Sequence, residues 1–173
     1  MSINQEQTTI GAQFASAFRT GAVFTLDVQC KVEVKPEKAF GLEANQPIPA
    51  DICGVIGLTS PKLMGSVTLC FPTPVFLHVM GSMFGETFSE VNDELAEGAG
   101  ELMNIIFGKA KTILNESGLS LEKALPTVVH GKDIKVTSFT KGEPTIVMPF
   151  STKCGTFHLL ITLMTQKEVR KAA

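Results

Sequence analysis

The sequence predicts an α+β fold in which two long helices pack on a largely antiparallel sheet. Two long segments carry apolar residues at helical spacing, and several shorter segments carry the apolar runs and alternation of strands. Most of the strand-like segments follow one another across short turns, which favours antiparallel pairing. A chain of 173 residues with 44% hydrophobic and 18% charged residues fits one globular domain, residues 1–173.

The N-terminal part of the chain predicts a helix and then a long strand. Apolar residues recur at helical spacing within Gln5 to Thr20, and Gly21 is expected to end this helix. From Phe24 to Val34 apolar and polar residues alternate, which predicts a strand with one solvated face. Residues 37–49 are expected to form a loop.

The middle of the chain predicts a hairpin and two helices. Strands near Ile52 to Leu58 and Ser66 to Phe71 are joined by turn residues, and the two prolines that follow stop pairing and open a short helix, Val75 to Phe84. A long helix covers about Asn92 to Glu116. Its N-cap is Asn92 or Asp93, and Gly118 closes it.

The C-terminal part predicts further strands and an internal repeat. The predicted strands are Lys123 to Val129, Ile134 to Phe139, Thr145 to Phe150 and Thr156 to Leu163. The stretch GVIGLTSPKLMGSVTLCF is similar to TIVMPFSTKCGTFHLLITL, since each is an apolar strand, a turn with lysine and glycine, and another apolar strand. The chain is therefore expected to consist of two pseudo-repeated halves, each a long helix followed by strands.

Composition and charge exclude several classes of function. The net charge is −2 and no basic run occurs, so no nucleic-acid partner is expected. No apolar run reaches about 18 residues and no signal peptide is apparent, so neither a membrane span nor export is expected. The four cysteines form no CxxC pair, and all are expected to be free thiols in strands of a cytoplasmic protein. The three histidines lack metal-ligand spacing, so no metal site is expected.

The long helix has one apolar and one polar side. The polar side comprises Glu97, Gly100, Glu101, Asn104, Gly108 and Lys111. This side is either a solvated face or a docking surface. Asparagine and glycine are poor helix formers, and each internal glycine costs about 1 kcal/mol relative to alanine. A bare patch with Glu101 and Asn104 projecting from it, one turn apart, favours docking, because an acid and an amide can hold a cation and a water side by side.

These residues carry a resemblance to a known family. Glu101-x-x-Asn104, the GKA sequence that begins at Gly108 and the LPTVVHG sequence that contains Pro126 resemble the CheC/CheX/FliY family of phosphatases, which act on phosphorylated CheY in chemotaxis. The family often has Asp or Ser where this chain has Glu97. CheC-like members carry a second Glu-x-x-Asn in the first helix. The corresponding IGAQFASAF here lacks it, so the chain is more similar to CheX.

The resemblance implies hydrolysis of the aspartyl phosphate on a CheY-like response regulator, with Asn104 positioning the water and Glu101 pairing with a receiver lysine. Glu97, Gly100, Gly108 and Lys111 are then docking positions. The chain is expected to need no cofactor of its own, because Mg²⁺ is supplied by the receiver. The resemblance further implies a homodimer formed by sheet extension, although the edge strand is not apparent.

Two other functions remain open from the residues. One is a non-catalytic response-regulator or flagellar-switch binding module of the same fold. The other is a structural domain that associates through its sheet edge. Nothing in the sequence names the cognate receiver or the behaviour that it controls.

Overall fold

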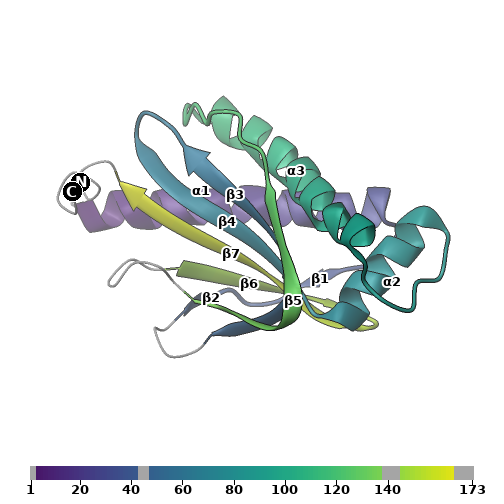
Figure 1. The fold of residues 1–173 in the computed structure, drawn as a ribbon. Helices are drawn as coiled ribbons and strands as arrows, with labels where there is room; N and C mark the ends of the chain where they lie inside the picture. The colour runs from purple at the N-terminus through teal and green to yellow at the C-terminus, as the bar shows by residue number, and fades with distance from the viewer. Residues whose placement is uncertain (1–2, 43–46, 138–144, 166–173) are drawn as a thin grey trace.

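The computed structural model describes residues 3–42, 47–137 and 145–165, and in this part of the chain helices α1 and α3 cover one face of a single antiparallel sheet (Figure 1). The strand order is β1-β6-β7-β4-β3-β5, and β2 also pairs with β6. The elements are α1 Ile3–Phe24, a π-helical turn Thr25–Gln29, β1 Lys35–Pro36, β2 Phe40–Leu42, β3 Ile48–Thr59, β4 Leu63–Phe71, α2 Thr73–Phe84, α3 Asp93–Glu116, β5 Thr127–Val136, β6 Thr145–Thr152 and β7 Gly155–Thr165. The predicted α+β class is confirmed.

The two hairpins, β3–β4 and β6–β7, lie side by side with β4 paired to β7. On the outer side of each hairpin lies a strand from the other half of the chain, since β2 pairs with β6 and β5 pairs with β3. Helix α1 contacts β6 and β7, whereas α3 contacts β3 and β5. This arrangement fits two pseudo-repeated halves, each with its helix over the other half's hairpin.

The strand predicted for Phe24 to Val34 is wrong. Helix α1 runs through Gly21 to Phe24 and continues into the π-helical turn. Leu26 and Cys30 are buried, while Phe24 and Val28 are exposed. An alternating apolar pattern also places a residue at every fourth position, so one subset of it can line a helix face. Gly21 therefore does not end the helix. Its absent side chain instead lets α3 approach closely, since a Cβ there would lie 2.8 Å from the carbonyl oxygen of Ile106.

Helix α2 begins at Thr73, two residues before the predicted Val75, and ends at Phe84 as predicted. Pro72 precedes it, and the Asp51 carboxylate accepts hydrogen bonds from the Thr73 backbone N–H at 2.8 Å and the Thr73 hydroxyl at 2.9 Å. Gly85 ends the helix in the left-handed conformation, φ +73°, which glycine adopts without strain. Helix α2 is thus anchored to β3 at one end and turned toward α3 at the other.

Helix α3 begins and ends as predicted. The Asn92 side chain accepts a hydrogen bond from the Leu95 N–H at 2.8 Å, and Gly118 adopts φ +81° just beyond the last turn. The helix lies directly on β3 at Gly54, where a Cβ would stand 2.6 Å from the carbonyl oxygen of Ala99. The absent side chain at Gly54 therefore sets how closely the helix approaches the sheet.

Replacing Gly54 by alanine is expected to lower the free energy of unfolding by about 1–3 kcal/mol, because the α3 backbone must move away from the sheet. Urea denaturation measures this loss. The matched control is Gly57→Ala on the same strand, where a Cβ would meet nothing within 4 Å. Equal stability of the two variants would show that the close approach at Gly54 is unimportant.

Strand β5 corrects a second prediction. Lys123 to Val129 and Ile134 to Phe139 were expected to be two strands, but Thr127–Val136 is one continuous strand paired with β3. A bulge in β3 between Ala50 and Ile52 shifts the register, so β3 stays paired with β5 across the gap between the two predicted strands. The end of the second predicted strand, residues 138–139, lies outside the described residues.

The cysteines follow the prediction only in part. Cys30, Cys53 and Cys70 are buried free thiols, but Cys30 ends the π-helical turn rather than lying in a strand, and Cys154 is exposed in the β6–β7 turn. Burial raises the pKa of the Cys30 thiol to about 11. Among the helices of the described ranges, none is long and apolar enough to cross a membrane.

Candidate active site on helix α3

Helix α3 has the two faces that its sequence predicts. The sheet-facing side is buried and contains Leu95, Ala99, Leu102, Met103, Ile106, Ala110 and Leu114. On the opposite side Glu97, Glu101, Asn104 and Gly108 are exposed, and Lys111 is half-buried. These five residues follow one another at steps of three or four, so they form one stripe along the outer surface.

Glu101 and Asn104 lie next to each other in the middle of this stripe. Both side chains are exposed, and neither forms a hydrogen bond or ion pair with another residue in the described part of the chain. The carboxylate and the amide therefore keep their full bonding capacity. An amide that serves the fold is usually bonded within it, as Asn115 is, whose Oδ1 accepts from the Leu121 N–H at 2.6 Å.

The three glycines of α3 differ in what surrounds them, and so in the reason for the missing side chain. The prediction that Gly100 lies on the open docking surface is wrong: it is buried, and a Cβ there would stand 2.9 Å from Val128 Cγ2 and 3.8 Å from Pro126 Cγ. Gly98 likewise makes room for Met80. At Gly108 a Cβ would meet nothing within 4 Å. Only Gly108 is left without an explanation inside the described fold.

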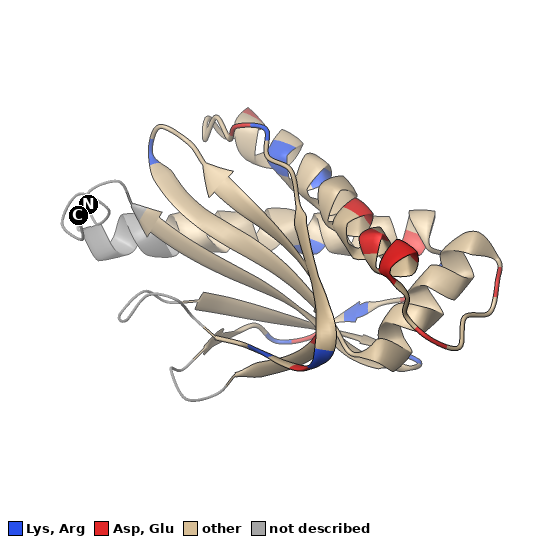
Figure 2. Ribbon diagram, viewed as in Figure 1, with Lys and Arg blue, Asp and Glu red and all other residues tan. Residues whose placement is uncertain are grey.

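Charge is unevenly distributed along α3. The acidic residues Asp93, Glu94, Glu97 and Glu101 lie in its first half, and Lys109 and Lys111 lie in its second half (Figure 2). The Lys109 ammonium lies 3.9 Å from the centroid of the Phe24 ring on α1, which fixes one of the two positive charges. A partner that lies along this helix meets negative charge before Asn104 and the two lysines directly beyond it, while Glu116 stands at the far end of the helix.

The segment between α3 and β5 adds an apolar residue beside the stripe. Pro126 packs over Gly100, directly before Glu101, and the preceding Leu125 is 78% exposed. Leu125 is not among the site residues that the sequence predicts, although it belongs to the LPTVVHG stretch. The available signal was a large apolar residue in a loop directly before a proline.

Among the residues that the structure describes, metal-ligating side chains do not gather near this face. Within the described ranges, no group of three or more His, Cys, Asp or Glu side chains is placed to hold a metal ion. His130 pairs with Asp93 at 3.1 Å, which joins β5 to the first turn of α3. The chemistry available on α3 is therefore that of a carboxylate and an amide open to a partner.

The family model described as Chemotaxis phosphatase CheX matches residues 52–151, which contain α2, α3 and the exposed pair. This chain belongs to the CheX family. A curated relative, the CheY-P phosphatase CheX of Thermotoga maritima, is 38% identical over 93 residues. That match covers 53% of this chain and 59% of the relative, so it spans less than two thirds of the relative's length.

Solved structures of CheX proteins share the fold. The chemotaxis protein CheX of Vibrio vulnificus is 30% identical, with a TM-score of 0.80 over 87% of this chain and 99% of that chain. The CheX–CheY–BeF₃–Mg²⁺ complex from Borrelia burgdorferi contains a chain that is 22% identical, with a TM-score of 0.70 over 87% of this chain and 97% of that chain. The likeness to the Borrelia protein is one of fold.

Proposed function

We propose that this chain hydrolyses the aspartyl phosphate of a phosphorylated CheY-like response regulator in chemotaxis signalling. The observation that carries the proposal is the exposed Glu101–Asn104 pair on α3, which has no partner within the described residues and lies inside the region matched by the CheX family model. A CheX relative is named as a CheY-P phosphatase, which supports the same activity here. The proposed place of action is the cytoplasm, where such receivers act.

Asn104 is the proposed catalytic residue. Phosphoryl transfer needs little covalent help and mainly requires positioning and charge stabilisation. An amide offers both a donor and an acceptor, so Asn104 can hold a water in line with the phosphorus without acting as a base. Its exposed position on a rigid helix lets it enter a partner's phosphorylation site.

Glu101 is the proposed docking carboxylate. It lies one turn before Asn104 and pairs with a lysine of the receiver, which fixes the position of the amide. Mg²⁺ belongs to the receiver in this proposal, and the Borrelia complex that contains CheX, CheY and Mg²⁺ supports that assignment. Glu97, Gly108 and Lys111 complete the docking stripe. Gly100 is not part of it, because its missing side chain leaves room for Val128 of β5 against the helix.

Replacing Glu101 by glutamine is expected to weaken receiver binding several-fold and to make association less sensitive to salt, because a charge pair is lost. Turnover at saturating receiver is expected to fall less than affinity. Titrations at two ionic strengths measure both effects, with Glu116→Gln at the end of the same helix as the control. An unchanged salt dependence in Glu101→Gln would contradict the ion pair.

A panel of phosphorylated receivers tests the proposed function against its main alternative. Phosphate release is measured with each receiver in excess over the protein, together with binding of the same receiver. Release above the intrinsic rate of one receiver is the expected result. If receivers bind but none releases phosphate faster than its intrinsic rate, the phosphatase is contradicted and the chain is a non-catalytic binding module.

A homodimer is a further part of the proposal. Strand β5 pairs with β3 on one side, and no strand of the described residues covers its other side. Such an edge offers backbone groups to a second copy. Edge-to-edge pairing leaves the outer face of α3 open, so each subunit keeps one site. Sedimentation at micromolar concentration is expected to show twice the chain mass, and a mass near 18.6 kDa would contradict the dimer.

A further inference from the structure

A cleft of about 480 Å³ lies between α2, the β6–β7 turn and the segment that follows the π-helical turn. No α3 residue lines it, so it is separate from the stripe of Glu101 and Asn104. Three lysines reach it from two distant parts of the sequence, together with one glutamate; these are Lys31, Lys35, Lys153 and Glu33. Its volume is within the usual range of small-molecule sites.

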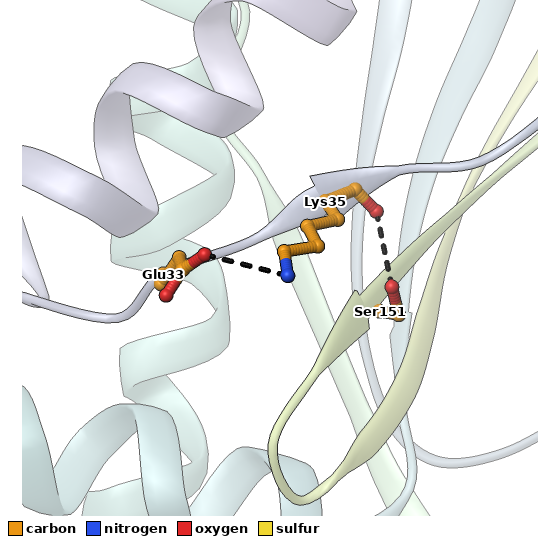
Figure 3. Close-up of polar contacts among 3 residues, drawn as sticks. All are labelled: Glu33, Lys35 and Ser151. Atoms are coloured by element: carbon orange, nitrogen blue, oxygen red, sulfur yellow. Dashed lines mark hydrogen bonds and ion pairs between the residues drawn. The ribbon is translucent and has the colours of Figure 1, made fainter.

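The charges in the cleft are not balanced. Glu33 pairs with Lys35 at 3.6 Å, and the Lys35 carbonyl accepts a hydrogen bond from the Ser151 hydroxyl at 3.3 Å (Figure 3). Neither Lys31 nor Lys153 has a carboxylate partner among the described residues. Like charges around one hollow repel one another, and an anion that enters the hollow relieves this repulsion.

The backbone at Lys31 gives independent support. The Val32 N–H donates to the Leu26 carbonyl at 2.9 Å, and this hydrogen bond caps the end of the π-helical turn. Lys31, the residue before Val32, adopts the left-handed conformation with φ +55°. Glycine is the usual residue at such a position because it adopts positive φ without strain. A lysine at this position is less favourable for the fold than glycine would be, so local backbone conformation does not account for it.

Neutral donors complete the cleft. His78 and Ser82 both line it, and they lie one turn apart on α2. Burial and the nearby Lys153 charge lower the pKa of His78, which is consistent with an imidazole facing that lysine. The Thr152 hydroxyl donates to the Gly155 carbonyl at 2.9 Å, so it stabilises the turn that presents Lys153.

We propose that this cleft binds a phosphate group, either as the free anion or on a small phosphorylated metabolite. Lys31 and Lys153 supply the charge, and His78 and Ser82 supply hydrogen bonds. An adjoining hollow of about 330 Å³ shares His78, Ser82 and Lys153 and is also lined by Phe88 and Glu86. It leaves room for the uncharged body of a metabolite whose phosphate lies on the lysine side, away from the Glu86 carboxylate. The proposal is independent of the phosphatase activity.

Calorimetry with inorganic phosphate, ribose 5-phosphate and ribose tests the proposal on the whole chain. Both phosphate-bearing probes are expected to bind and ribose is not. Tighter binding of ribose 5-phosphate than of phosphate would support a metabolite, and equal binding would support the free anion. Absence of binding by both phosphate probes would overturn the site, as would binding of a hexaglutamate peptide with no binding of phosphate.

The decisive variant combines Lys31→Gly with Lys153→Gln. It is expected to weaken binding of the better phosphate probe at least tenfold, while Lys31→Gly alone leaves the melting temperature unchanged or higher. The control combines Lys62→Gln with Lys132→Gln, which removes two exposed lysines that do not line the cleft. Equal affinities of the two double variants would overturn the proposal. Receiver dephosphorylation is expected to be normal in both.

Discussion

Replacing Asn104 by alanine is expected to lower the turnover of phosphorylated receiver at least about a hundredfold, which corresponds to losing ~3 kcal/mol of transition-state positioning. The loss falls on kcat because the amide acts on the water and not on docking. The free energy of unfolding is expected to change little, since the Asn104 side chain is exposed and bonded to no other described residue. Phosphate release at saturating receiver and urea denaturation measure the two quantities.

Thr112→Ala is the matched control for Asn104→Ala. Thr112 is also exposed on α3, and its hydroxyl donates to the Gly108 carbonyl one turn earlier, at 3.1 Å. This variant is expected to keep near-normal turnover. An Asn104→Ala variant that retains half of the wild-type rate would exclude the proposed catalytic role.

Replacing Gly108 by leucine is expected to weaken receiver binding at least tenfold while stabilising the fold slightly. No described atom lies within 4 Å of a Cβ at this position, so the new side chain projects into the space proposed for the receiver. Leucine is a better helix former than glycine by several tenths of a kcal/mol to about 1 kcal/mol. Receiver titration and thermal melting measure the two opposite effects.

The control for Gly108→Leu is Glu116→Leu, which places the same side chain on an exposed position in the last turn of α3. Its receiver affinity is expected to stay near that of the wild type. Normal receiver affinity in Gly108→Leu would show that the stripe around Gly108 is not the docking surface.

The elements predicted well from the sequence carry strong local signals. Helix α3 has a capping asparagine, a closing glycine and an apolar stripe that together define its bounds and its buried face. The two hairpins are marked by turn residues between apolar runs. Glu101 and Asn104 were placed correctly on the exposed side, because the outward direction on a helix follows from spacing alone.

The wrong predictions depend on contacts between distant segments. The alternation after Phe24 is compatible with both a strand and a helix, and packing of Leu26 into the core decides for the helix. Gly100 was assigned to docking because nothing local shows that Val128 returns to cover it. The cleft at Lys31 and Lys153 is likewise absent from the linear pattern, since the fold brings together residues far apart in the chain.

The most direct test of the proposed activity is a single-turnover measurement on the receiver that the panel selects. Its phosphate is followed over time at saturating wild-type protein and without protein. We expect the decay rate to rise with protein concentration to a plateau well above the intrinsic rate of the receiver. A receiver that is fully bound, yet loses its phosphate at its intrinsic rate, would contradict the proposed phosphatase.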